Sequence, residues 1–203
     1  DEGDNLNHDK GMLSILEIQK AIKKLNDSDP IMKEDPLKVR MGLNSGDVIL
    51  CDIGAAKARV DLTMIGDAVN IAARLETACS QYFIDNLVSD SVAKDAREQF
   101  SIRIIDRIKV YGKDTPVAVY EIINEIENTS QEENDLIKHF EKGFEAYTKG
   151  KFSAGLKHFQ KSKPLEIDRG YASTPSDVYI SRCKMLEKSS PDNWDGTWTL
   201  ESK

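Results

Sequence analysis

Asn70 and Arg74 lie one helical turn apart in the stretch TMIGDAVNIAARLE, which runs from Thr63 to Glu76. On a helix, side chains four positions apart share one face, with their bases about 5–6 Å from each other. Asn offers both a donor and an acceptor, and Arg offers a rigid fork of donors that matches phosphate oxygens. A helix N-terminus adds partial positive charge, so this face could stabilise a phosphorus centre that gathers negative charge.

The spacing alone also fits a second interpretation. Asn70 could satisfy a backbone group in the first turn of the helix, and Arg74 could pair with a surface carboxylate. The residues before the helix fit its start, because Gly66 ends extended structure and Asp67 is a favourable N-cap. The predicted helix itself is AVNIAARLETAC.

The composition of the chain narrows the class of protein. Its 203 residues are 39% hydrophobic and 31% charged, with a net charge of −7 and a pI of about 5.1. These values are typical of a globular protein with one sizeable domain and a smaller appendage. The acidic balance argues against a general nucleic-acid binder, although a few local cations suffice for one polyphosphate. Cys51, Cys79 and Cys183 show neither disulfide nor metal-ligand spacing, so we expect small buried thiols in a reducing cytoplasm.

The ends of the chain show no targeting or membrane signal. No apolar run approaches the roughly 20 residues that a membrane span needs, and no signal peptide is visible. The chain opens on DEGDNLNHDKG, without an initiator Met and without a strand before the first predicted helix. We therefore expect a piece of a longer protein, which would contact a membrane only through a missing N-terminal region.

Residues 1–126 are predicted to alternate helices with strands, which indicates an α/β sandwich with helices on a sheet. Helical spacing over Gly11–Asp27 gives one buried face, and a turn-rich connector follows it. The next two extended runs flank Asn44-Ser45-Gly46 and predict a β-hairpin between residues 38–43 and 47–54. Further strands are predicted at residues 83–90, 101–112 and 117–126, with a helix at 92–100.

Residues 127–135 read as a polar, acidic linker, and residues 136–203 as a helical extension. The extension is predicted to hold two helices around a turn at residues 149–151, and a third helix at 176–188. One helical hairpin buries too little surface to stand alone, so it should pack on the main domain or on a partner. Both tryptophans lie in the tail after the third helix, and we expect them to anchor it.

Small and aromatic residues in the extension resemble a tetratricopeptide repeat. Gly143, Gly155 and Phe159 occupy the small, small and aromatic positions, and Tyr147 lies about one position from its expected place. This pattern predicts two closely packed helices.

The segment from residue 40 to residue 76 resembles the catalytic domain of the class III nucleotidyl cyclases, the adenylate and guanylate cyclases. The family pattern runs Arg-x-Gly-x-x-x-Gly, then Gly, then Asp-Tyr-Thr-x-x-Gly-Asp-x-Val-Asn-x-Ala-x-Arg-Leu-Glu. Leu62 replaces the usual Tyr, and the resemblance extends more loosely over residues 11–124. The matching positions are Arg40, Gly42, Gly46, Gly54, Asp61, Thr63, Gly66, Asp67, Val69, Asn70, Ala72, Arg74, Leu75 and Glu76.

This resemblance implies a ferredoxin-like fold, only part of which is present, and an enzyme of bacterial type. Such enzymes convert ATP to 3′,5′-cyclic AMP and pyrophosphate at a homodimer interface, with two Mg²⁺ or Mn²⁺ ions. Asn70 would orient the ribose, and Arg74 would stabilise charge on the α-phosphate. Thr63 would read the purine, because bacterial adenylate cyclases commonly carry a hydroxyl there and guanylate cyclases often a Cys. Lys113, or alternatively Lys109, would contact the terminal phosphates.

The resemblance leaves the metal site and the purine open. The two metal-binding aspartates of the family precede the residues present here, so no metal ligand is assigned; Asp1, Asp4 and Asp9 lack the strand that should hold them. One alternative is a guanylate cyclase of the same mechanism, which competition between ATP and GTP would distinguish. Another is a non-catalytic cyclase-like module that regulates or dimerises, which the upstream sequence would distinguish.

Overall fold

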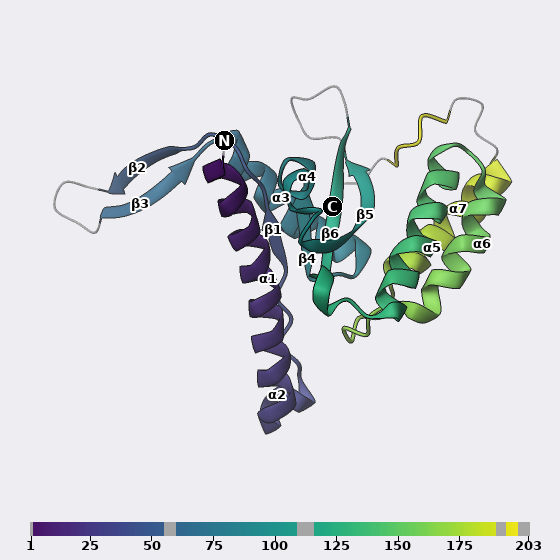
Figure 1. Cartoon of the computed structure of the whole chain (residues 1–203), viewed down its shortest axis with the longest axis horizontal. Coiled ribbons are helices and arrows are strands. Elements are labelled where there is room, and N and C mark those ends of the chain that lie inside the picture. The colour runs from purple at the N-terminus through teal and green to yellow at the C-terminus, as the bar shows by residue number, and fades with distance from the viewer. Residues whose placement is uncertain (1, 55–59, 109–115, 190–193, 199–203) are drawn as a thin grey trace.

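A four-stranded sheet forms the centre of the first part of the chain (Figure 1). The computed structural model describes residues 2–54, 60–108, 116–189 and 194–198. The strands lie in the order β1 (Met41–Leu43), β4 (Asn86–Ser89), β6 (Val117–Glu125) and β5 (Phe100–Ile108). In the sheet β1 and β4 are parallel, whereas β6 runs antiparallel to both of its neighbours.

Helices cover both faces of this sheet, which makes the fold a mixed α+β sandwich as predicted. One face packs against α1 (Glu2–Ser28) and α4 (Asp90–Ala96). The other face packs against α3 (Asp67–Tyr82) and the helices that follow the sheet. Strand β4 shows the alternation, because Val88 is buried in the first layer and Leu87 in the second.

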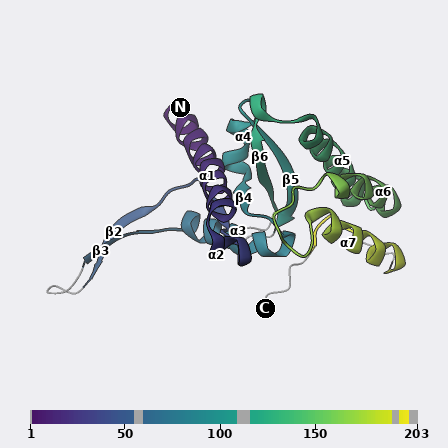
Figure 2. The ribbon, with the colours of Figure 1, turned by 90° about the horizontal axis from the view of Figure 1, so that it is seen from below.

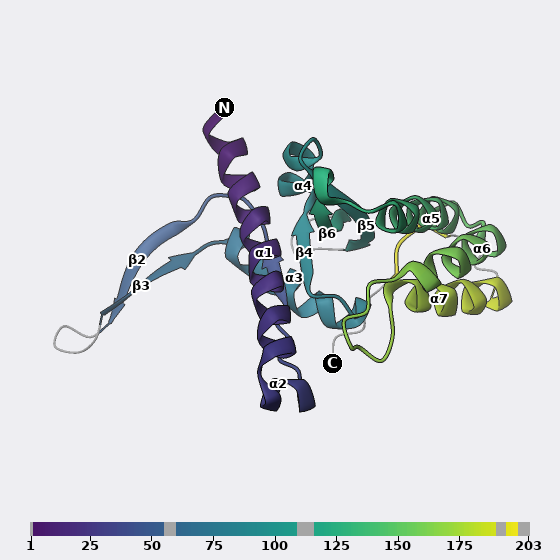
Figure 3. The same cartoon turned by 60° about the horizontal axis from the view of Figure 1, so that its bottom comes forward.

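A separate two-stranded hairpin projects away from the sheet (Figure 2). It pairs β2 (Ile49–Gly54) with β3 (Val60–Ile65) in antiparallel register. All three ribbon views, including Figure 3, place it on the side of the molecule opposite to the C-terminal helices.

The predicted hairpin between residues 38–43 and 47–54 is therefore wrong. β1 pairs in parallel with β4, and β2 pairs with the later strand β3. The Asn44–Gly46 cluster changes the direction of the chain without joining paired strands. A turn signal is local, whereas the partner of a strand is chosen by packing that the turn does not encode.

Two helix starts also differ from the predictions. The N-cap of α3 is Gly66, and Asp67 is the first helical residue, where its negative charge favours the positive end of the helix. The turn-rich connector contains a short helix, α2 (Pro30–Glu34). Its N-cap Asp29 accepts hydrogen bonds from the backbone N–H groups of residues 31 and 32, and proline suits the first helical position.

The helix predicted at residues 92–100 begins at Asp90 and ends at Ala96. Phe100 belongs instead to β5, where it pairs with Glu125 of β6. Its aromatic ring packs in the first core layer with Met12 of α1, so tertiary packing decides this boundary.

The C-terminal part of the chain is helical. A capping box between Ser130 and Glu133 starts α5 within the segment predicted as a linker, and the predicted turn at residues 149–151 separates α5 from α6. The predicted third helix is also present. The elements are η1 (Ile126–Asn128), α5 (Gln131–Thr148), α6 (Phe152–Ser162), η2 (Lys163–Leu165) and α7 (Pro175–Ser189).

Small residues let α5 and α6 approach closely. A Cβ atom on Gly155 would lie 3.1 Å from the carbonyl oxygen of Gly143, and a Cβ on Gly143 would lie 2.9 Å from the ring of Phe159. Phe159 is fully buried and stacks on Tyr179 of α7, with ring centroids 4.8 Å apart. The small and aromatic positions therefore hold the three helices together.

The helical extension packs on the sheet, as expected for a unit too small to stand alone. One buried cluster unites Leu75 of α3 and Ile105 of β5 with Phe140 and Phe144 of α5. The tail is anchored too, because the indole N–H of Trp194 donates to the carbonyl oxygen of Tyr147 at 2.9 Å.

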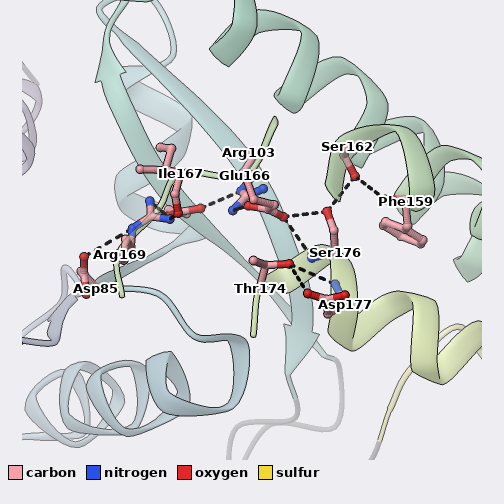
Figure 4. Close-up of polar contacts among 11 residues, drawn as sticks. Asp85, Arg103, Phe159, Ser162, Glu166, Ile167, Arg169, Thr174, Ser176 and Asp177 are labelled. Atoms are coloured by element: carbon pink, nitrogen blue, oxygen red, sulfur yellow. Dashed lines mark hydrogen bonds and ion pairs between the residues drawn. The ribbon is translucent and has the colours of Figure 1, made fainter. Parts of the chain in front are cut away.

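Buried charges also hold the extension on the sheet (Figure 4). Arg103 of β5 is fully buried; its Nε donates to Glu121 at 2.6 Å and its Nη2 to Glu166 at 2.8 Å. Glu166 also accepts a hydrogen bond from the hydroxyl of Ser176 at 2.6 Å. Arg169 pairs with Glu121 as well. A buried ion left without its partner costs several kcal/mol, so these pairs oppose any partial separation of the extension.

The cysteines largely follow the expectation of inert thiols. Cys79 and Cys183 are buried, and Cys51 is partly exposed. Burial raises the pKa of Cys79 and that of Cys183 to about 12 each, which keeps both thiols protonated and unreactive near neutral pH. Among the described residues, no helix is both long and apolar enough to cross a lipid bilayer.

The imidazole of His158 on α6, which lies near that of His139 on α5, should make stability depend on pH. The ring centroids of His139 and His158 lie 6.0 Å apart, and neither Nδ1 has a hydrogen-bond partner among the described residues. Burial lowers the pKa of His158, and His139, Lys161 and Lys142 lower it further. The unfolded chain then takes up the proton more readily, so stability falls as the pH drops below the usual value of 6.5.

We therefore expect His158→Gln to lose less stability than the wild type between about pH 7.5 and pH 5.5. Urea unfolding at the two pH values measures the free energy of unfolding of each protein. The carboxylates contribute equally to the loss of unfolding free energy in both proteins, so the difference between the two losses reports His158 alone. Equal losses of stability in both proteins would contradict the attribution of this pH dependence to His158.

Candidate functional site

Helix α3 carries Asn70 and Arg74 on its exposed face. The opposite face of the helix is buried against the sheet through Leu75, Ala78 and Cys79. Asn70 and Arg74 are both exposed and lie in the first two turns. The structure therefore presents an amide and a guanidinium side by side at the positive end of a helix dipole.

The position of α3 depends on Gly42 in β1. A Cβ atom at residue 42 would lie 2.1 Å from the carbonyl oxygen of Ala72 and 2.6 Å from the backbone nitrogen of Glu76. Both neighbours are helix backbone, so a side chain could not be accommodated by a change of rotamer. Glycine is therefore required for this close approach of strand and helix.

Polar contacts reinforce the same junction. Nε of Arg40 lies 2.8 Å from a carboxylate oxygen of Glu76, and this pair is partly exposed, so it adds little stability. The side-chain amide of Asn44 donates to the carbonyl oxygen of Ala68 at 3.1 Å. The residue before β1 and the residue after it are therefore both tied to α3.

Thr63 lies on β3, opposite Cys51 in the hairpin, and is partly exposed. The hairpin leads through Gly66 directly into α3, so Thr63 and Asn70 flank the same corner of the chain. Lys113 and Lys109 fall outside the described residues.

The hairpin exposes an unusual amount of apolar surface. Its exposed apolar side chains, each more than half accessible, are Ile49 (69%), Leu50 (61%), Leu62 (65%), Met64 (57%) and Ile65 (51%). Surface hydrophobic residues are normally scattered, and a continuous apolar patch marks an interaction surface. The run Val48-Ile49-Leu50 could have revealed this from the sequence, because consecutive apolar residues in a two-stranded ribbon cannot all be buried.

The described cavity lies elsewhere. Its volume is about 600 Å³, and it is lined by α1, the connector before β1 and residues 167–170, but not by Thr63, Asn70 or Arg74. Asn70 and Arg74 are exposed on α3 and do not line this cavity.

The described side chains do not form a metal site. Within residues 2–54, 60–108, 116–189 and 194–198, no three His, Cys, Asp or Glu side chains gather to hold an ion. Asp9 lies on helix α1, where it accepts a hydrogen bond from Gln99 at 2.6 Å. The described side chains therefore do not supply the ligands that a pair of divalent cations needs.

The comparison with known protein families now identifies the class. The sequence model described as the adenylate and guanylate cyclase catalytic domain matches residues 7–124, more than half of the chain. The chain belongs to this family.

Individual relatives are adenylate cyclases. The chain is 34% identical over 126 residues to an adenylate cyclase of Anabaena cylindrica, covering 59% of this chain and 25% of that protein. It is 25% identical over 186 residues to the terminal-differentiation-specific adenylate cyclase of Dictyostelium discoideum, covering 87% of this chain and 8% of that protein. The chain thus spans a quarter or less of the curated relatives it matches.

Among solved structures, the adenylyl cyclase CyaB from P. aeruginosa is 27% identical, with a TM-score of 0.46. That alignment covers 57% of this chain and 58% of the solved one.

Replacing Gly42 should test the placement of α3. We expect Gly42→Ala to destabilise the protein by more than about 3 kcal/mol, because the new methyl group meets backbone atoms on a buried helix face. Thermal unfolding followed by circular dichroism measures the effect.

Gly11→Ala in α1 is the matched control. The nearest atoms to its Cβ would belong to the side chain of Leu43, with Cδ2 closest at 3.1 Å, and alanine favours a helix interior by about 1 kcal/mol. Its unfolding midpoint should be unchanged or higher. Comparable midpoints for the two variants would show that β1 and α3 are not in close contact.

Proposed function

We propose that this chain supplies Asn70 and Arg74 to a nucleotide cyclase site shared between two protomers, which makes 3′,5′-cyclic AMP and pyrophosphate from ATP. The observation that carries the proposal is the exposed amide–guanidinium pair at the root of an apolar hairpin. We assign residues 1–126 to the catalytic domain, 127–135 to a linker and 136–203 to a tetratricopeptide-like extension, and we place the activity in the cytoplasm.

The proposed reaction is an intramolecular displacement at the α-phosphorus. The ribose O3′ gives its proton to water and forms a bond to phosphorus, while the bond to the bridging oxygen breaks and pyrophosphate leaves with the electron pair. Negative charge grows on the equatorial oxygens, where the fork of Arg74 can donate two hydrogen bonds. Asn70, one turn earlier, can hold the ribose so that O3′ lies in line with the leaving group.

The apolar hairpin supports a second copy of the chain as the partner. Burying five large side chains that are more than half exposed would be favourable in an assembled dimer. An open surface becomes a closed site when a partner covers it, which also excludes water from the reacting phosphate.

The proposal includes Mg²⁺ or Mn²⁺, on the strength of family membership rather than of the described side chains. When bound, such ions would neutralise phosphate charge and lower the pKa of the attacking hydroxyl. Their ligands are proposed to lie in sequence that precedes these residues in the full-length protein.

Truncation of Arg74 should test the proposed role directly. In the full-length protein, Arg74→Ala should lower kcat by about a hundredfold or more, because a charge contact made in the transition state is lost. Conversion of ATP to cyclic AMP in the presence of Mg²⁺ or Mn²⁺ measures the rate.

Gln81→Ala provides the control, because Gln81 is equally exposed on α3 but lies near the other end of the helix. It should keep the wild-type rate. Equal rates for Arg74→Ala and wild type would rule out the proposed role of Arg74, and a wild-type protein without cyclase activity would remove the enzyme proposal altogether.

Thr63 should influence the choice of purine. We expect Thr63→Val, which replaces the hydroxyl by a methyl group of similar size, to lower kcat/KM for ATP by about tenfold and to change that for GTP less, because one hydrogen bond is lost. Competition between ATP and GTP in one reaction measures the preference. A wild-type protein that prefers GTP would establish the guanylate cyclase alternative.

A further inference from the structure

Tyr82 ends helix α3 and connects it to the helical extension. Its hydroxyl donates to Oδ2 of Asp106 on β5, and the same oxygen accepts a hydrogen bond from Nη1 of Arg182 at 2.8 Å. Arg182 belongs to α7, and only 7% of its side chain and 1% of that of Asp106 are exposed. One buried carboxylate oxygen therefore joins the site helix to the extension.

The guanidinium of Arg182 is enclosed by aromatic rings. Its central carbon lies 5.4 Å from the ring centroid of Tyr82, 5.1 Å from that of Tyr179 and 5.0 Å from that of Trp198. These distances fall within the range of cation–π attraction. Burial raises the pKa of Tyr82 far above its usual range, so its hydroxyl stays a donor. The hydroxyl of Tyr82 is therefore protonated near neutral pH and donates to Asp106.

The connection reaches the site through the body of α3. Tyr82 follows Arg74 by about 12 Å of helix. Gly42 holds the middle of the helix against β1, and Tyr82 holds its C-terminal end against β5 and α7. Contacts at two points along one helix restrict its tilt and its rotation about its own axis. The directions in which Asn70 and Arg74 point depend on both contacts, and a displacement of about 1 Å in such groups can cost about a hundredfold in rate.

We propose that Arg182 is a positioning residue for the cyclase reaction. Through Asp106 and Tyr82 it fixes α3 so that Asn70 and Arg74 face the nucleotide of the partner protomer. This inference rests on the proposed function. It gives the helical extension a part in turnover, in addition to any part in stability.

Two mild variants of the full-length protein test the connection. Tyr82→Phe removes the hydroxyl and keeps the ring, and Arg182→Lys keeps the charge but removes the fork. Each should lower kcat by about tenfold while KM for ATP stays unchanged, since binding precedes the step that needs alignment. The double variant should be no slower than the slower single variant, because both changes break the same connection.

Ser162→Ala is the matched control within the extension. The hydroxyl of Ser162 is buried in α6 and lies 2.7 Å from that of Ser176. Among the described residues, its hydrogen bonds go to Phe159 and Ser176 and not to Tyr82, Asp106 or Arg182. This variant should lower the thermal midpoint and leave kcat at the wild-type value. A similar loss of kcat in Ser162→Ala, or an unchanged kcat in Tyr82→Phe, would show that the extension acts only on stability.

A second measurement does not depend on turnover. Hydrogen exchange of the backbone amides in the first two turns of α3 should be faster in Tyr82→Phe and Arg182→Lys than in the wild type, and unchanged in Ser162→Ala. Unchanged exchange in the first two variants would overturn the positioning role. Absence of cyclic nucleotide from the wild type would instead overturn the proposed function, so the two failures can be told apart.

Discussion

The contact between Gly42 and the middle of α3 sets the geometry on which the rest of the molecule depends. A methyl group at residue 42 would meet a backbone oxygen at 2.1 Å, so strand and helix approach as closely as two backbones can. The hairpin enters α3 at its N-terminus, and the extension contacts it at Tyr82. The apolar arm, the exposed polar pair and the C-terminal helices are thus all placed relative to one helix.

The extension is held by charges as well as by an aromatic core. Arg103, Glu121 and Glu166 are buried at one contact, and Asp106 and Arg182 at another. Such pairs add little stability over apolar residues of the same size, but a single unpaired member is strongly unfavourable. Docking of the extension is therefore expected to be all-or-none, because a half-open state would leave several ions in a dry environment.

Much of the fold follows from local signals in the sequence. Helical periodicity locates α5, α6 and α7, and alternation locates β5 and β6. The partner of β2 was mistaken, because Asn44-Ser45-Gly46 resembles a hairpin turn while the choice of β3 depends on non-local packing. Likewise, Phe100 was assigned to a helix that the sheet interrupts. Local patterns in the sequence therefore predict single elements, but they do not predict which strands pair with each other.

In the candidate site, too, local geometry could be predicted from the sequence and long-range contacts could not. The spacing of Asn70 and Arg74 sufficed to place them on one face of a helix, because that geometry is local. The connection from Arg182 to Tyr82 could not be predicted, since Asp106 lies in a strand and its two partners come from helices about 100 residues apart along the chain. A charged residue in a strand is usually exposed, and only the structure places these three together.

Both tryptophans of this chain lie in the tail that packs against the extension. Trp194 donates a hydrogen bond to the carbonyl oxygen of Tyr147, and the two ring centroids lie 5.2 Å apart. The ring of Trp198 makes a cation–π contact with the guanidinium of Arg182. Within these residues, intrinsic indole fluorescence is therefore a local optical probe of the junction between tail, α5 and α7. Any change in emission on adding a nucleotide would have to travel through this junction, because no indole lies beside Asn70 or Arg74.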